Sequence, residues 1–102
     1  MTQQFQRDKP IYLQVVDTII QEIVSGIRQS GEKLPSVREY AIEVGVNPNT
    51  IQRVYRELDQ RQITITKRGQ GTYVTENSRL ITQVREELKK QFHRTFNENP
   101  VH

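Results

Sequence analysis

The sequence contains no cysteine among its 102 residues, which excludes disulfide bonds and metal sites built on thiolates. It also contains no apolar run near the roughly 20 residues that a membrane-spanning helix requires. The first ten residues, MTQQFQRDKP, lack the basic segment followed by an apolar segment that marks a secretory signal. We therefore expect a soluble, cytoplasmic protein without a membrane partner.

Side chains suited to catalysis or metal binding are equally scarce. The two histidines, His93 and His102, have no partner at the spacing of a zinc site or a catalytic triad. The carboxylates, including Asp59 and the pair Glu86-Glu87, are interpreted as surface charges. We therefore expect no enzyme, no metal and no cofactor.

The chain is mildly basic, with a formal net charge of +3 and an isoelectric point near 9.4. An excess of this size is ordinary for a solvated surface, although its sign is compatible with nucleic acid as a partner. A chain of 102 residues is long enough for one small domain with a small core.

The first predicted helix lies between Pro10 and Ile27. Its apolar residues recur at three- and four-residue spacing: Ile11, Val15, Val16, Ile19, Ile20, Ile23, Val24 and Ile27. Pro10 is suited to the first turn of this helix, and Gly26 to its end. The pattern predicts one amphipathic helix whose apolar stripe packs into the core.

A second, short helix is predicted from about Val37 to Val44. Ser36 stands three residues before Glu39, which is the spacing of a capping box. Gly45 follows the helix and suits the left-handed backbone conformation that ends many helices. The start and the end of this helix are therefore both marked in the sequence.

A third helix is predicted over residues 47–61. Asn47 can cap it with its side-chain oxygen, and Pro48 fits the first helical position, where the backbone N–H has no partner within the helix. One side carries an apolar stripe of Ile51, Val54, Tyr55 and Leu58. The opposite side carries Asn49, Gln52, Arg53 and Arg56. We expect the first side to pack and the second to be exposed.

Only Gly45 and Val46 separate the second helix from the third, and so short a turn with an apolar residue in it is typical of a helix-turn-helix. After the third helix, the alternation in residues 63–66 and 72–75 predicts two strands. Residues 67–71, KRGQG, would join them as a hairpin with a cationic tip. The sequence therefore predicts a mainly α fold with a small β hairpin, a winged helix-turn-helix.

The exposed side of the third helix has the side chains that recognise DNA bases. Asn and Gln pair with adenine in the major groove and Arg pairs with guanine, so Asn49, Gln52, Arg53 and Arg56 are candidates. Candidates for the DNA backbone and the minor groove are Arg38, Thr50, Lys67, Arg68 and Gly69. The alternative is an ordinary solvated helix face, with Thr50 bonded to its own first turn and the glycines serving the hairpin.

A last helix is predicted from Asn77 or Ser78 onward. Its apolar residues stand at helical spacing: Leu80, Ile81, Val84, Leu88, Phe92 and Phe96. This stripe either packs back on the domain or pairs with a second copy, and the near-heptad steps favour pairing. We accordingly expect a DNA-binding domain over residues 1–76 and a helical dimerisation segment over residues 77–102.

Residues 31–74 resemble the DNA-binding domain of the GntR family of bacterial transcription regulators. The resemblance extends over residues 9–75 and rests on LPS at 34–36, Arg38, the turn GV with NPNT after it, Leu58 and GQGTYV at 69–74. NPNT and the short C-terminal extension are most similar to the small YtrA-type subgroup. In that subgroup a brief helical dimerisation region follows the winged helix-turn-helix.

The resemblance implies operator DNA as partner, a homodimer, and the following DNA-binding residues: Ser36, Arg38, Asn47, Asn49, Thr50, Gln52, Arg53, Arg56, Lys67, Arg68, Gly69, Gln70 and Gly71. Some members carry arginine in place of Pro48 and Gln52, so their guanine contacts are not implied here. Asn49 and Gln52 suggest adenine instead. Gln62 occupies a place where the family often has glycine, and the last 27 residues are too few to enclose a metabolite pocket.

The leading hypothesis is a homodimeric repressor that recognises an inverted repeat, with helix 47–61 in the major groove and wing 67–71 on the adjacent minor groove. Two alternatives stay open. The chain is the N-terminal DNA-binding part of a larger, enzyme-fused regulator, or it is a winged helix used for protein contacts through residues 80–96.

Overall fold

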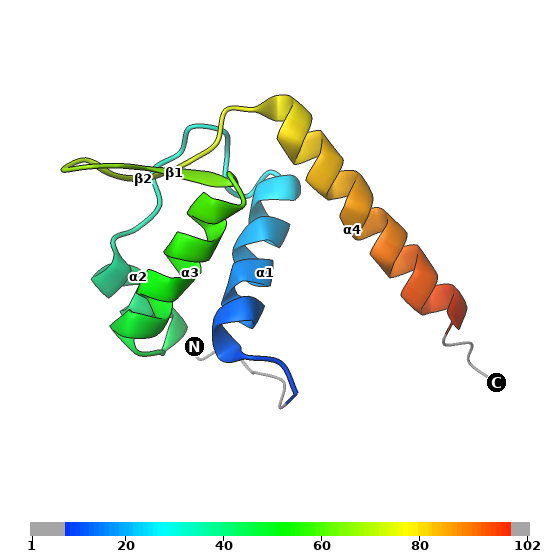
Figure 1. Cartoon of the computed structure of the whole chain (residues 1–102), viewed down its shortest axis with the longest axis horizontal. Coiled ribbons are helices and arrows are strands. Elements are labelled where there is room, and N and C mark those ends of the chain that lie inside the picture. The colour runs from blue at the N-terminus through cyan, green and yellow to red at the C-terminus, as the bar shows by residue number, and fades with distance from the viewer. Residues whose placement is uncertain (1–7, 99–102) are drawn as a thin grey trace.

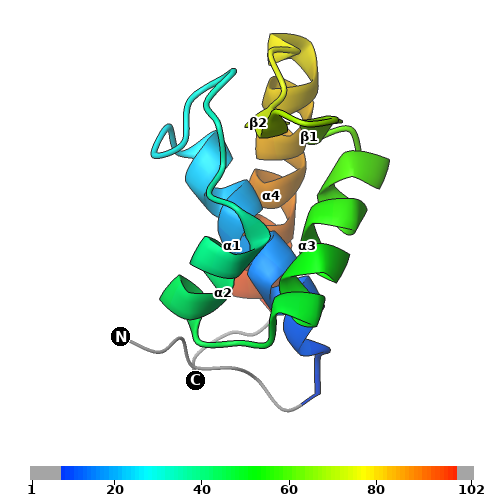
Figure 2. The ribbon, with the colours of Figure 1, turned by 90° about the vertical axis from the view of Figure 1, so that its left-hand side faces the viewer.

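The computed structural model describes residues 8–98, with side chains as far as Gln91. The elements are α1 (Ile11–Val24), α2 (Val37–Val44), α3 (Pro48–Gln60), β1 (Thr64–Lys67), β2 (Gly71–Val74) and α4 (Ser78–Glu98). In Figure 1 the first three helices form a bundle, the β1–β2 hairpin projects from one end of it, and α4 descends on the other side. In the rotated view of Figure 2, α4 lies behind α1. The predicted winged helix-turn-helix with one additional helix is confirmed.

The core lies where α1 and α2 pack against α3. Side chains from α1 and α3 with at most 1% of their surface exposed are Val15, Val16, Ile19, Ile51, Val54 and Leu58. Full burial of one such side chain is worth about 1.5–3 kcal/mol of transfer free energy. The apolar stripes predicted for the two helices therefore hold the bundle together.

The stripe of α1 is shorter than the sequence predicts. Ile11 and Ile27 keep 46% and 71% of their surface exposed. The helix ends at Val24, and Gly26 has a φ of 87°, which turns the chain out of the helical path. Ile27 lies beyond the helix, so its assignment to the stripe is wrong; Ile11 lies in the first turn, at the exposed end of the bundle.

The ends of α2 and α3 are as predicted. The Ser36 hydroxyl accepts a hydrogen bond from the Glu39 N–H at 3.1 Å, and the Glu39 carboxylate accepts one from the Ser36 N–H at 2.9 Å. These bonds also lower the pKa of Glu39. Gly45 has a φ of 84°, and the Asn47 side-chain oxygen accepts from the Asn49 N–H at 2.7 Å. Local interactions therefore set the direction in which α3 leaves the turn.

Two tyrosines join α2 to α3. The rings of Tyr40 and Tyr55 stack with their centroids 6.2 Å apart. The Tyr55 hydroxyl donates to the carbonyl oxygen of Pro35 at 2.7 Å. Burial raises the pKa of Tyr40 to about 12 and raises that of Tyr55 as well. Both phenols are therefore uncharged core groups at neutral pH.

The hairpin is antiparallel, with Thr64 opposite Val74 and Lys67 opposite Gly71. Its strands occupy residues 64–67 and 71–74, one residue away from the predicted 63–66 and 72–75. The difference arises because Ile63 still belongs to the turn after α3, where its N–H donates to the Leu58 carbonyl at 3.0 Å.

Helix α4 packs along α1. Ile81 is 8% exposed and joins the core, and the Arg85 guanidinium donates to the Val24 carbonyl at 3.0 Å. Three further predicted residues are partly buried against the core: Leu80, Val84 and Leu88. The side chains of Phe92 and Phe96 lie outside the described ones. Within residues 8–98, no helix is both long and apolar enough to cross a membrane.

Gln62 connects α3 to the wing in a conformation that favours glycine. Within the described part of the chain it is the single non-glycine residue with a positive φ, 64°. A left-handed L-residue costs roughly 1–2 kcal/mol. Gln62→Gly should therefore raise the free energy of unfolding by about 1 kcal/mol, after allowance for the entropy of glycine. Urea denaturation followed by circular dichroism measures this change.

The matched control is Gln60→Gly, in the last turn of α3. Glycine has no conformational advantage there, so this variant should lose about 0.5–1 kcal/mol. A loss of stability in both variants would contradict the assignment of strain to Gln62.

Candidate nucleic-acid interface

The polar side of α3 faces outward. Its predicted base-contacting residues are all exposed: Asn49, Gln52, Arg53 and Arg56. Thr50 is partly buried in the first turn, and Arg38 is exposed in the first turn of α2. The structure thus presents these side chains on α2 and α3 of one helix-turn-helix, as the periodicity of the sequence predicts.

Two stretches of this surface, the first turns of α3 and the hairpin, contain no negative charge. Residues 44–56 include two arginines and no acidic residue. Residues 60–75, which include the wing, contain three cationic residues and no acidic one. Acidic side chains occur on α1, on α2 (Glu39 and Glu43), in the last turn of α3 (Glu57 and Asp59) and along α4. Charge of one sign on neighbouring elements raises the local concentration of anionic partners.

The wing, residues 67–71, is the other cationic element. Its residues are exposed except for Gly71, which is partly buried. Gly69 has a φ of 77° and empty space around the position of a Cβ atom, so backbone conformation alone accounts for glycine there. The Lys67 ammonium lies 4.8 Å from the centroid of the Tyr73 ring, which holds this cation beside the strand.

Lys33 is a cation at the base of the wing that sequence reasoning missed. It forms an isolated antiparallel bridge with Tyr73 of β2. Its side chain crosses Gly71, where an added Cβ atom would lie 2.7 Å from the Lys33 Cε atom. No local pattern around Lys33 indicates this position, because the two segments are far apart in the sequence.

Ser36 and Asn47, two predicted DNA-binding residues, already act as helix caps. Their side-chain oxygens accept backbone hydrogen bonds at the starts of α2 and α3. The hydroxyl hydrogen of Ser36 and the amide hydrogens of Asn47 remain as donors on the exposed surface. Each residue can therefore cap its helix and donate to an anion as well.

Asp59 connects the end of α3 to strand β1, which leads into the wing. Its two carboxylate oxygens accept hydrogen bonds from the hydroxyls of Thr64 and Thr66, each at 2.5 Å. The Thr66 hydroxyl also lies 2.9 Å from that of Thr72 on β2. Asp59, interpreted from the sequence as a surface charge, is therefore also a partly buried hydrogen-bond acceptor. Threonines two residues apart lie on one face of a strand, which is the signal that could have indicated it.

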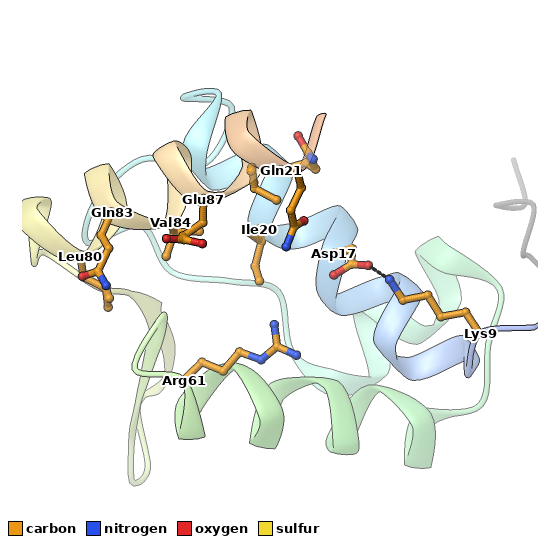
Figure 3. Close-up of a pocket in the computed structure, with 11 residues that line it drawn as sticks. Lys9, Asp17, Ile20, Gln21, Arg61, Leu80, Gln83, Val84 and Glu87 are labelled. Atoms are coloured by element: carbon orange, nitrogen blue, oxygen red, sulfur yellow. Dashed lines mark hydrogen bonds and ion pairs between the residues drawn. The ribbon is translucent and has the colours of Figure 1, made fainter. Parts of the chain in front are cut away.

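A groove of about 460 Å³ lies on the surface along the contact of α1 with α4 (Figure 3). Its apolar lining consists of Ile20, Leu80, Val84 and Leu88. Polar residues complete it, among them the ion pair of Lys9 with Asp17, together with Gln21, Arg61, Gln83, Glu87 and Gln91. Among the described residues, no three acidic or histidine side chains gather in a way that could hold a metal ion.

The family profile for "Bacterial regulatory proteins, gntR family" matches residues 11–74. That match includes the helix-turn-helix and the whole hairpin. The chain belongs to the GntR family. The predicted resemblance is thereby confirmed, and this GntR chain is a transcriptional regulator with a winged helix-turn-helix domain, not an enzyme.

Similar proteins place this GntR chain with small regulators of the YtrA type. The HTH-type transcriptional regulator YhcF of Bacillus subtilis is 46% identical over 91 residues, which are 89% of this chain and 75% of YhcF. The HTH-type transcriptional repressor YtrA of the same organism is 40% identical over 87 residues, 79% of this chain and 67% of YtrA.

Solved structures give the same result for the fold. A GntR family transcriptional regulator from Listeria monocytogenes superimposes with a TM-score of 0.87 at 46% identity, over 93% of this GntR chain and 83% of its own. The DNA-binding domain of AraR, solved in complex with operator ORX1, superimposes with a TM-score of 0.66 at 26% identity. That match covers 74% of this chain and 95% of the AraR domain.

The contacts of Asp59 predict a loss of stability on its removal. Asp59→Ala leaves the hydroxyl of Thr64, a residue only 2% exposed, without its acceptor. The free energy of unfolding should fall by about 1–3 kcal/mol. Asp59→Asn keeps one acceptor oxygen and should lose less. Urea denaturation of the purified variants measures both.

Glu57→Ala is the control for loss of an acidic residue from the same helix. It removes only the surface ion pair with Arg61 at 2.8 Å, worth about 0.3–0.5 kcal/mol. Equal losses for the Glu57 and Asp59 variants would mean that Asp59 has no special role in joining α3 to the wing.

Proposed function

We propose that this GntR regulator is a homodimeric repressor that binds an inverted-repeat operator. Helix α3 lies in the major groove, and the wing lies on the adjacent minor groove. The observation that carries the proposal is the exposed surface of α3 and the wing, which has cations and amides but no carboxylate on residues 44–56 and 60–75. DNA presents a complementary surface of phosphates flanking base edges.

The chemistry of each side chain suggests which part of the DNA it contacts. Asn49 and Gln52 can each donate to and accept from an adenine, and Arg56 can donate two hydrogen bonds to a guanine. Arg38 and Thr50 lie at helix starts, where they suit the sugar-phosphate backbone. Residues at the wing and near its base provide minor-groove and phosphate contacts: Lys33, Lys67, Arg68, Gly69, Gln70 and Gly71.

The AraR complex supports DNA as the partner. The AraR domain was solved bound to an operator, and this chain shares the fold of almost the whole AraR domain. The name of YtrA, a transcriptional repressor, supports repression as the regulatory outcome.

The α1–α4 groove supports the dimer. In one chain, α1 covers Leu80, Val84 and Leu88 only partly. A helix of a second copy seated along the groove would remove their remaining apolar surface from water. A two-fold dimer would also place two copies of α3 about 34 Å apart, one turn of B-DNA, which matches an inverted repeat.

Selection of random duplexes by the purified chain, at near-physiological salt, tests the function. The proposal expects one enriched motif with two-fold symmetry. The triple substitution of Arg53, Arg56 and Arg68 by alanine should abolish binding to that motif, since each good arginine contact is worth about 1–3 kcal/mol. A plot of log affinity for the motif against log salt concentration should be linear, with a slope of about −0.9 for each neutralised phosphate.

Arg79→Ala is the matched control, an exposed arginine at the start of α4, outside the proposed interface. It should bind like the wild type. Retention of duplexes without any enriched motif would contradict sequence recognition, and failure to bind DNA at all would favour a protein-contact function.

The dimer is tested by analytical ultracentrifugation, which compares the dimer dissociation of Leu88→Gln with that of Lys89→Gln, a substitution at the neighbouring residue. Leu88 lines the groove, whereas Lys89 is exposed. Burial of a leucine side chain is worth about 1.5–3 kcal/mol, so the first variant should dissociate at roughly 10- to 100-fold higher concentration. The second should remain dimeric. A wild-type chain that stays monomeric, alone and on DNA, would contradict the dimer.

A further inference from the structure

Arg53 lies against Tyr12 of α1. The central carbon of its guanidinium is 3.8 Å from the centroid of the tyrosine ring, the distance of a stacked contact. Arg53 is exposed, and among residues 8–98 its guanidinium has no hydrogen-bond or ion-pair partner. One face of the guanidinium is therefore occupied, while its N–H groups remain available to a ligand.

The stack lies in a surface hollow where the first turns of α1 and α3 meet. The hollow has a volume of about 450 Å³ and is lined by Pro10, Ile11, Tyr12, Asn49, Thr50 and Arg53. Figure 1 shows both helices starting at the same end of the bundle. The hollow thus adjoins two predicted DNA-contacting residues, Asn49 and Thr50.

The stack lowers the entropy that Arg53 loses when it binds a ligand. An exposed arginine loses side-chain rotamer entropy when a ligand immobilises it. A ring that already holds the guanidinium plane removes part of that loss before binding. The N–H groups lie in the guanidinium plane, so stacking on one face leaves them free to donate two parallel bonds to an anion.

The position of the stack distinguishes phosphate from bases. Tyr12 belongs to α1, which flanks α3, and the contact draws the Arg53 side chain toward α1. The guanidinium of Arg53 therefore lies at the edge of the exposed side of α3 that carries Gln52 and Arg56. A side chain at the border of the major groove meets the DNA backbone before it meets a base edge.

We propose that Tyr12 is a positioning residue for DNA binding, which holds the guanidinium of Arg53 for a bidentate contact with one backbone phosphate. The inference rests on the proposed DNA-binding function and extends the interface to α1, a helix otherwise assigned to the core. The aromatic face of Tyr12 performs this role, and its hydroxyl is not required.

A double-mutant cycle on the selected duplex tests the proposal. Arg53→Ala should weaken binding about 10-fold and reduce the slope of log affinity against log salt by about 0.9. In a Tyr12→Leu background, which lacks the ring, the same substitution should weaken binding less than about threefold. Tyr12→Phe keeps the ring face and should bind within about twofold of the wild type.

Arg56→Ala is the matched control within α3. Within residues 8–98, Arg56 makes no cation–π contact with Tyr12, so its substitution should weaken binding by the same factor in both backgrounds. Independent effects of Tyr12→Leu and Arg53→Ala would overturn the proposal. So would a Tyr12→Phe variant that binds as weakly as Tyr12→Leu.

Tyr12 also packs partly against the core, so Tyr12→Leu is first checked by thermal unfolding. If that variant does not fold, Arg53→Lys replaces it, because lysine keeps the charge but loses the planar stack and the paired donors. Arg53→Lys should bind about fivefold more weakly, and wild-type affinity would overturn the proposal. A wild-type chain that binds no duplex would instead refute the proposed function itself.

Discussion

The structure depends on the burial of one side of α3. Ile51, Val54 and Leu58 are completely enclosed by the bundle. Because successive side chains on a helix are rotated by about 100°, this enclosure fixes the direction of every other residue on α3. The amides and arginines of the helix therefore have to point outward. One packing constraint establishes both the core of the domain and the surface that we assign to DNA.

The features that could be predicted from the sequence are those decided by residues close together in the chain. The caps at Ser36 and Asn47 and the left-handed Gly45 each depend on a few adjacent residues, so α2 and α3 begin and end where expected. The strand limits differ from the prediction by one residue because Ile63 still belongs to the turn after α3. Gln62 adopts a left-handed conformation in that turn, and a glycine there would have indicated the turn more clearly.

Contacts between distant segments could not be predicted. The stack of Tyr12 on Arg53 joins two helices that the periodicity describes separately. The apolar stripe of α4 has the same form whether its partner is this chain or another copy. The structure shows that Ile81 is buried within the chain, and that the residues beside it retain exposed surface. Periodicity identifies an apolar face but not its partner.

The hydrogen bonds of Asp59 with Thr64 and Thr66 attach β1, the strand that leads into the wing, to the end of α3 at two points. In the DNA-binding mode that we propose, these bonds resist a change in the spacing between α3 and the wing. A mismatch with the spacing of neighbouring grooves would then be accommodated by bending or twisting of the DNA. The elastic cost of that deformation depends on base steps that the protein never touches, so the proposed interface would select operators by their flexibility as well as by their bases.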